Sequence, residues 1–212
     1  MDVILFGATG MVGQGVLREC LLDPRVNRVL TIGRSASGER HPKLREIAQA
    51  DLADLSSLNV DGYDACFFCL GVSSAGMDEA SYRKVTYDLT LAVAKQLAAR
   101  NPNMTFIYVS GAGTGGSSMW ARAKGDTEND LLKLPFKAAY MFRPALIQPM
   151  HGTRSRTTSY RIFYVLTRPF LPLLRRFPKF MTTTEQIGRA MINATANGAP
   201  KKVLESDDIN RL

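Results

Sequence analysis

The sequence predicts an α/β fold in which a doubly wound parallel sheet forms a single domain. Short apolar runs without strict alternation recur along the chain, as is typical of parallel strands covered on both faces. Helical patterns separate most of these runs, as in successive βα units. A glycine-rich turn directly follows the first run, at the point where such sheets bind their ligands.

Six apolar segments are expected to form strands, because each is a short hydrophobic run flanked by turn-forming residues. In chain order these are residues 3–6, 26–32, 44–49, 65–70, 104–109 and 138–142. Right-handed crossovers between successive strands leave few arrangements other than a doubly wound sheet. The ligand of such a sheet lies at the carboxyl ends of the strands, where the strand order reverses.

Four helices are expected between and after these strands. They cover residues 11–22, 78–100, 118–134 and about 184–197. In the longest, apolar residues recur at steps of three and four from Tyr82 to Leu97, so one stripe faces the sheet. Pro102 follows the end of that helix. Thr184 or a neighbouring residue is expected to cap the last helix.

With 212 residues, of which 45% are hydrophobic and 22% charged, the chain has the composition of one globular domain, residues 1–212. A chain of this length can fold without disulfides or a structural metal. The cysteine count of three is odd and the first residues lack the basic region of an export signal, so we expect a cytoplasmic location. Arg168, Pro169 and Pro172 interrupt the longest apolar stretch, residues 162–174, so we expect no transmembrane segment.

A basic stretch stands out against a body that is close to neutral. The net charge is +8, and ten basic but no acidic residues lie between Leu131 and Thr184. This stretch indicates an anionic partner. Residues 154–180 are also rich in aromatic side chains, so we expect residues 151–181 to form a substrate lid or a homodimer face. Peripheral contact with an anionic membrane is the alternative, and nucleic acid is not expected because no nucleic-acid-reading motif is present.

The glycine-rich turn predicts a nucleotide site. Gly7 permits the tight turn, Gly10 lets the backbone approach a pyrophosphate, and Gly13 permits close packing of the helix on the strand. The start of the following helix offers N–H groups and a partial positive charge to phosphates. The expected cofactor contacts of this turn are Gly7, Thr9, Gly10, Met11, Val12 and Gly13.

The end of the second expected strand favours NADP(H), with NAD(H) as the alternative cofactor. NAD sites usually carry an acidic residue there, whereas this chain has Arg34 and Ser35, which can hold a 2′-phosphate. A solvated loop cation is the alternative interpretation of Arg34. Asp51 and Leu52, after the third strand, could hydrogen-bond the adenine amino group and cover the ring, or Asp51 could simply cap the next turn.

The ordered combination of motifs resembles an atypical short-chain dehydrogenase/reductase with a Rossmann fold. The motifs are the glycine-rich turn, Gly33-Arg34, Asp51-Leu52, Leu70-Gly71, Val109-Ser110-Gly111, residues 120–128 and Arg143-Pro144-Ala145. Within that superfamily the chain is similar to the NAD-dependent epimerase/dehydratase group, and most of all to its small Tat-interacting-protein-like branch. The resemblance covers essentially the whole chain and implies an oxidoreductase that transfers a hydride to or from a small carbonyl or conjugated substrate.

The resemblance also implies a catalytic group with one departure. Ser110 would orient the substrate oxygen, and Lys124 would bind the nicotinamide ribose and lower the pKa of a tyrosine four residues before it. That position holds Trp120, whose indole donates a hydrogen bond but cannot exchange a proton near neutral pH.

Three interpretations of the tryptophan at position 120 are possible. The substrate can take its proton from water or another side chain; the protein can bind the cofactor without chemistry, as a sensor or interaction protein; or Tyr160 or Tyr164 can supply the proton.

The resemblance places further residues beside the nicotinamide half of the cofactor. These are Leu70, Gly71, Val72, Pro144 and Ala145. His151 and Arg154 could meet an anionic substrate or could be ordinary loop residues. Cys66 and Cys69 are expected on opposite faces of a strand as core residues, and no metal site is expected with only two histidines in the chain.

Overall fold

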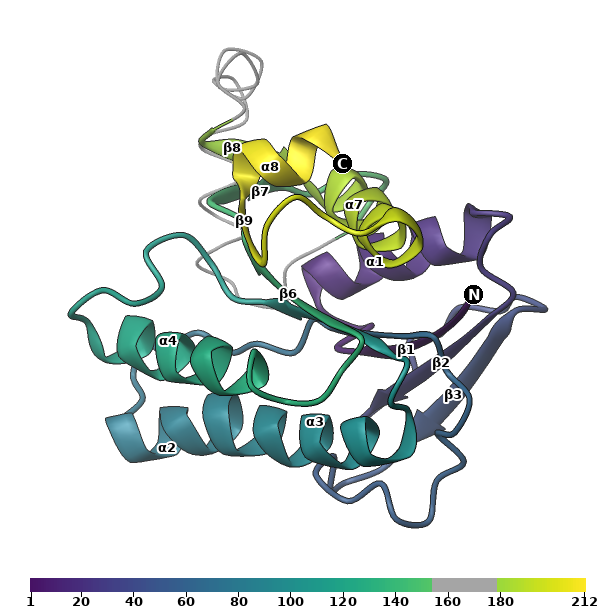
Figure 1. Cartoon of the computed structure of the whole chain (residues 1–212), viewed down its shortest axis with the longest axis horizontal. Coiled ribbons are helices and arrows are strands. Elements are labelled where there is room, and N and C mark those ends of the chain that lie inside the picture. The colour runs from purple at the N-terminus through teal and green to yellow at the C-terminus, as the bar shows by residue number, and fades with distance from the viewer. Residues whose placement is uncertain (154–178) are drawn as a thin grey trace.

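A computed structural model describes residues 1–153 and 179–212. Within these residues, seven strands pair in parallel in the order β3-β2-β1-β4-β5-β6-β9 (Figure 1). The strands are β1 (Asp2–Phe6), β2 (Arg28–Gly33), β3 (Leu44–Ala48), β4 (Ala65–Phe68), β5 (Thr105–Val109), β6 (Ala138–Arg143) and β9 (Val203–Glu205). The order reverses between β1 and β4, so the predicted doubly wound sheet is confirmed and its switch point lies there.

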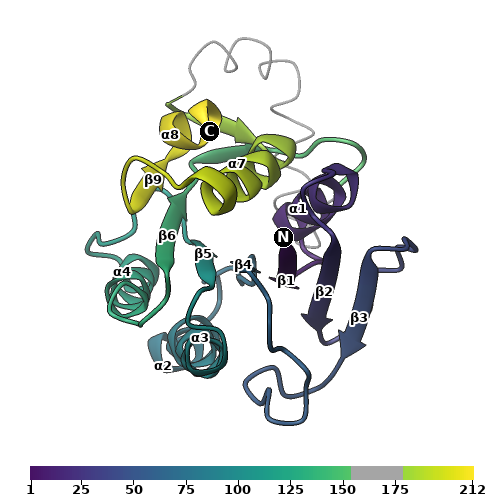
Figure 2. The same cartoon turned by 45° about the vertical axis from the view of Figure 1, so that its right-hand side comes forward.

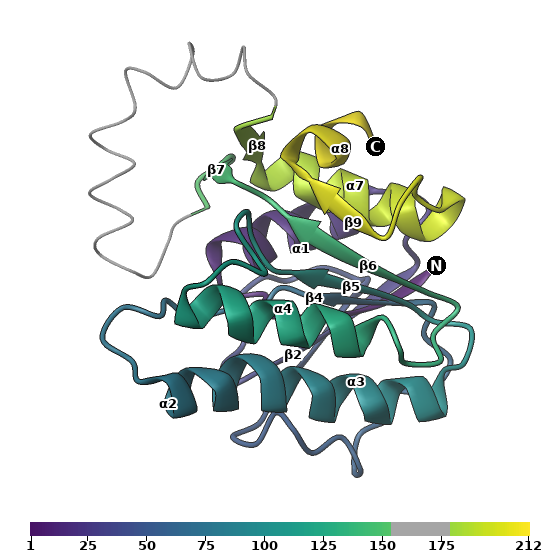
Figure 3. The ribbon, with the colours of Figure 1, turned by 60° about the vertical axis from the view of Figure 1, so that its left-hand side comes forward.

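Helices cover both faces of the sheet (Figures 2 and 3). On one face lie α1 (Met11–Leu22) and α7 (Thr184–Asn197), and on the other α2 (Glu79–Arg83), α3 (Leu89–Arg100) and α4 (Met119–Leu131). The alternation of side chains along β1 serves both cores: Val3 and Leu5 pack toward α1 and α7, whereas Ile4 and Phe6 pack toward α3 and α4. Burial on both faces explains why the central strands β1 and β4 are almost continuously apolar, whereas the edge strand β3 is partly exposed and carries Arg45 and Glu46.

The expected strands and helices are confirmed, with shifts of one to three residues at several ends. The second strand starts at Arg28 rather than residue 26, and the helix expected at 118–134 runs from Met119 to Leu131. The helix expected at 78–100 contains a π-helical turn, η1 (Lys84–Asp88), between α2 and α3. Thr183 caps α7 in a capping box with Gln186, so a neighbour of Thr184 provides the cap.

Within residues 1–153 and 179–212, four short elements were not predicted from the sequence. They are β7 (Leu146–Gln148), β8 (Met181–Thr183), β9 and α8 (Ser206–Arg211). The three strands have three residues each, which is too few for a periodic pattern, and β9 forms because β6 offers it a paired edge. β7 and β8 pair as a separate two-stranded parallel sheet at the two ends of the expected lid.

The two cysteines at 66 and 69 lie on opposite faces of the sheet, as predicted. Cys66 belongs to the core under α3 and α4, and Cys69 packs against the core under α1 and α7. Burial raises the pKa of both thiols, as expected for inert core residues. No helix in the described residues combines the length and apolar character needed to cross a bilayer, and they hold no cluster of three metal-ligating side chains.

Candidate functional site

A cavity of about 700 Å³ opens at the carboxyl ends of β1, β4, β5 and β6. This is the switch-point position at which doubly wound sheets bind ligands. The predicted site residues that line it are Gly10, Met11, Val12, Leu70, Gly71, Val72, Ser110, Trp120, Lys124, Pro144 and Ala145. Gly10 and Ala145, which are 135 residues apart in sequence, therefore line one space.

The glycine-rich turn has the geometry that its sequence predicts. Gly7 has a φ of +83°, and a methyl group there would lie 2.7 Å from the backbone of Cys69. A methyl group on Gly13 would lie 2.0 Å from the carbonyl oxygen of Gly7, so α1 packs directly on the turn. Gly10 meets only that oxygen, at 3.3 Å, and lines the cavity. Within the described residues no side chain caps α1, which leaves N–H groups of its first turn available for an anion.

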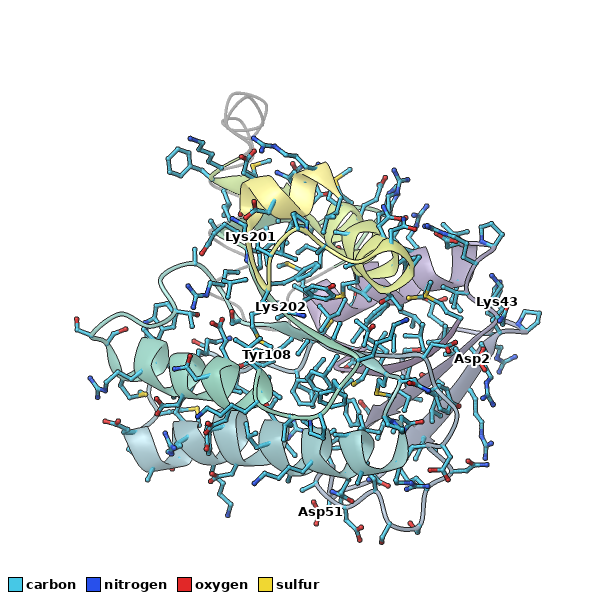
Figure 4. All side chains as sticks on the ribbon, in the orientation of Figure 1. Asp2, Lys43, Asp51, Tyr108, Lys201 and Lys202 are labelled. Atoms are coloured by element: carbon cyan, nitrogen blue, oxygen red, sulfur yellow. The ribbon has the colours of Figure 1, made fainter. Side chains whose placement is uncertain are left out.

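Ser110, Trp120 and Lys124 line one wall of the cavity, as the resemblance implies. Lys124 Nζ donates to the Ser110 carbonyl oxygen at 2.8 Å and lies 5.6 Å from the centre of the Tyr108 ring. Figure 4 shows Tyr108 in the interior of the molecule. Trp120 lies one helical turn before Lys124, and its ring packs against Gly113. Trp120 thus stands at the sequence position where the resemblance implies a tyrosine.

A buried carboxylate that the sequence analysis missed connects to this wall. The Ser110 hydroxyl donates to Glu128 and also lies 3.2 Å from the carbonyl oxygen of Phe142. Glu128 is 2% exposed and binds the guanidinium of Arg143, with Nη2 to Oε2 at 2.5 Å and Nε to Oε1 at 3.0 Å. Because the Ser110 proton points to Glu128, the Ser110 oxygen faces a ligand mainly as a hydrogen-bond acceptor.

The electrostatics of the wall centre on Lys124. Burial lowers the pKa of Lys124 to about 8, although the charge of Glu128 partly opposes this shift. The same carboxylate raises the pKa of Arg143, which stays charged. Among the described lining residues of this cavity, Lys124 is the cationic one, and its pKa lies near enough to neutral pH for it to give up a proton.

A second missed residue holds the segment after β6. Ser206, the first residue of α8, is 1% exposed and accepts a hydrogen bond from the Ala145 N–H at 2.9 Å. Ser206 belongs to no recognisable motif, and Glu128 ends the 120–128 motif without a role that the resemblance assigns to it. A charged residue four positions after Lys124 on the inward face of α4 was the one available signal for Glu128.

The predicted adenosine contacts do not line the cavity. Arg34 and Ser35 are exposed just after β2, at the sheet edge expected for a 2′-phosphate. Asp51 lies at the periphery (Figure 4) and accepts a hydrogen bond from the Ala53 N–H at 2.9 Å. No helix follows Asp51 directly, so its side chain stabilises a turn and does not cap a helix. Leu52 is buried in the core, with 6% of its surface exposed, and has little surface left to cover an adenine.

Other predicted residues lie apart from the cavity wall or outside the described residues. Thr9 and His151 line a second cavity, of about 590 Å³, and His151 Nε2 contacts Glu185 at 2.6 Å. Arg154, Tyr160, Tyr164 and the rest of the expected lid between residues 154 and 178 fall outside the described residues.

The fold and the glycine-rich cavity define a nucleotide-binding protein of the doubly wound class. The model of the NAD dependent epimerase/dehydratase family matches residues 3–211, and the chain belongs to this family. The resemblance to the epimerase/dehydratase branch of the short-chain dehydrogenases is thereby confirmed.

Two fungal relatives are similar over much of the chain. Protein fmp52, mitochondrial, of Emericella nidulans is 35% identical over 69% of this chain, and the match spans 66% of that protein, just under two thirds. Protein FMP52, mitochondrial, of Chaetomium globosum is 29% identical, with 99% of this chain and 95% of that protein covered. Their names contradict the expected cytoplasmic location, which was wrong because free cysteines indicate a reducing environment without identifying the compartment.

Solved structures share the fold at low sequence identity. The Bordetella bronchiseptica enzyme WbmF, in complex with NAD⁺, superposes with a TM-score of 0.66 at 18% identity, covering 99% of this chain and 76% of its own. The UDP-glucuronic acid 4-epimerase from Bacillus cereus, in complex with NAD, gives 0.70 at 15% identity, covering 96% and 77%. At this identity the likeness shows the Rossmann architecture.

Proposed function

We propose that this protein is an NADP(H)-dependent oxidoreductase that transfers a hydride to or from a small carbonyl or conjugated substrate. The observation that carries the proposal is the single cavity at the switch point, in which the glycine-rich turn faces Ser110 and Lys124. The uncapped start of α1 and the open space above Gly10 suit a pyrophosphate. When bound there, the nicotinamide would supply or accept the hydride.

Each residue of the wall has a separate task in this proposal. Lys124 would hold the nicotinamide ribose through N–H groups that it does not use on Ser110. The backbone of Pro144 and Ala145, held by Ser206, would position the carboxamide. Ser110 would orient the substrate oxygen, with its own proton fixed on Glu128. Trp120 would close the wall and exclude water.

The preference for NADP(H) rests on the end of β2. Arg34 and Ser35 stand there in place of the acidic residue that NAD sites usually carry, and the Glu46 carboxylate of the neighbouring β3 already accepts from the Thr31 hydroxyl at 3.0 Å and the Ser37 N–H at 2.8 Å. The neighbouring structures named above contain NAD, so this preference is the finer part of the proposal. NAD(H) as the cofactor is the direct alternative.

A non-catalytic NADPH-binding regulator is the second candidate, because Trp120 replaces the proton-exchanging tyrosine of the family. An assay of NADPH oxidation across aldehydes, ketones, quinones and flavins separates the two. Turnover that falls at least tenfold in Ser110→Ala supports the enzyme. Calorimetric binding of NADPH without turnover of any acceptor would assign the regulator, and absence of binding would overturn both. The basic region at 151–181 stays a predicted lid or dimer face in either case.

A further inference from the structure

The cavity wall contains few groups that can exchange a proton. Among its described lining residues these are Cys69, Tyr82 and Lys124. Burial raises the pKa of the Cys69 thiol well above neutrality, which leaves it protonated and inert. Tyr82, on α2, is 2% exposed. Lys124 lies on the same helix and the same side as Trp120, where the family places its proton donor.

The surroundings of Lys124 lower the pKa of its ammonium group. On its own helix the group that acts on Lys124 is Glu128, and on β5 the Tyr108 ring lies 5.6 Å from its Nζ; Tyr82 of α2 lines the same cavity. The Glu128 carboxylate could hold a proton on Lys124, but it binds Arg143 at 2.5 Å and also accepts from Ser110. Burial therefore outweighs this single carboxylate, and the pKa of Lys124 falls to about 8.

Access from the cavity is the second requirement. Lys124 keeps part of its surface open, and it is one of the residues that line the cavity. One N–H is fixed on the Ser110 carbonyl oxygen at 2.8 Å, which aims the ammonium at the strand end where Ser110 also faces the ligand. An ammonium has three donors, so two stay available for a ribose hydroxyl and a substrate oxygen.

We propose, on the basis of the function proposed above, that Lys124 itself exchanges the proton with the substrate oxygen, in place of the tyrosine that Trp120 replaces. In reduction, a hydride from nicotinamide C4 forms the new C–H bond as the carbonyl π bond breaks. The Lys124 ammonium gives its proton to the oxygen, an N–H bond breaks and an O–H bond forms. Neutral Lys124 would then recover H⁺ from the solvent, and the bound cofactor, having supplied the hydride, would be left in its oxidised form.

Competitive labelling of the unliganded protein tests the titration directly. Lysines are acetylated with trace acetic anhydride between pH 6 and 10.5, and the modified peptides are quantified by mass spectrometry. Labelling of Lys124 should rise with a midpoint near pH 8, whereas a lysine in an unstructured reference peptide labelled in the same solution follows a midpoint near 10.4. A Lys124 midpoint equal to that of the reference peptide would overturn the proposal.

Removing one nearby charge tests the same titration, because the direction in which the labelling midpoint moves can be predicted. Glu128→Gln removes the charge that raises the pKa of Lys124, so the labelling midpoint should move to lower pH. Glu205→Gln is the matched control, because Glu205 contacts Arg143 at 3.7 Å and is not among the groups that act on Lys124. An unchanged midpoint in Glu128→Gln, or an equal shift in both variants, would contradict this arrangement.

Kinetics separate proton exchange from ribose binding. Lys124→Arg keeps a positive charge and N–H donors but cannot give up a proton, so turnover should fall about 10²- to 10⁴-fold while NADPH binding changes only a few-fold. Lys124→Gln, which keeps N–H donors but has no proton to give, serves if the larger arginine disturbs folding. Full turnover in Lys124→Arg would overturn the proposal and leave the oxidoreductase intact. If turnover is lost in Tyr82→Phe but kept in Lys124→Arg, Tyr82 supplies the proton. If the wild-type protein binds the cofactor but turns over no acceptor, both proposals are overturned.

Discussion

The contact between Gly13 and Gly7 allows the effect of one methyl group to be worked out. In Gly13→Ala the new Cβ would lie 2.0 Å from the Gly7 carbonyl oxygen and 2.6 Å from its carbon. Both are backbone atoms that cannot rotate away, so α1 must move off the turn. Overpacking costs about 1–3 kcal/mol of stability, and the 2.0 Å contact places Gly13→Ala at the upper end, about 3 kcal/mol. Alanine recovers about 1 kcal/mol of helix propensity, so the net loss is about 2 kcal/mol.

For a chain of this size, 1 kcal/mol lowers Tm by about 2–4 °C, so Gly13→Ala should melt about 4–8 °C lower. Differential scanning calorimetry measures this change. Gly10→Ala is the matched control: its Cβ meets one atom at 3.3 Å, so Tm should change little, but the methyl enters the cavity and should weaken NADPH binding at least tenfold. An unchanged Tm in Gly13→Ala, or unchanged binding in Gly10→Ala, would refute this account of the turn.

Three further outcomes are expected. Arg34→Ala should weaken NADPH at least tenfold and leave NADH nearly unchanged, because charge-assisted hydrogen bonds contribute about 1.5–3 kcal/mol; equal weakening in calorimetric titrations would show that Arg34 does not read the 2′-phosphate. Ser206→Ala leaves the Ala145 N–H without its partner and should destabilise the fold by about 1–3 kcal/mol in urea unfolding, whereas Ser206→Thr, if it keeps the bond, should cost less; equal losses would place the effect elsewhere. Between about pH 8 and 10.5 the unfolded chain keeps the Lys124 proton that the folded chain loses, so the unfolding free energy of the wild type should rise with pH relative to Lys124→Met; a flat difference would contradict the lowered pKa.

The elements that can be predicted from the sequence are those with a long or strongly apolar pattern. β1 with its glycine-rich turn and α1 could be predicted because turn, strand and helix each carry their own signal in adjacent residues. β7, β8 and β9 could not, because three residues show no period and their strand character depends on partners distant in sequence. The π-turn at Lys84–Asp88 interrupts a helical pattern that looks continuous in sequence.

The site divides in the same way. Ser110 and Lys124 were found because they fit a spaced motif, and the fold brings both to the cavity. Glu128 and Ser206 escaped because their tasks come from burial and from contacts with Arg143 and Ala145, which no local pattern encodes. Leu52 was assigned to the adenine although its apolar side chain fills the core instead.

The central claim, that the cavity holds the nicotinamide beside Trp120, is tested most directly by fluorescence. Trp120 is the one tryptophan of the chain, so its emission reports on this wall alone. Titration with NADPH should quench Trp120 saturably, with energy transfer to the reduced nicotinamide, and at lower concentrations than NADH. NADPH binding seen by calorimetry without any change in Trp120 emission would contradict the claim, because the cofactor would then lie elsewhere.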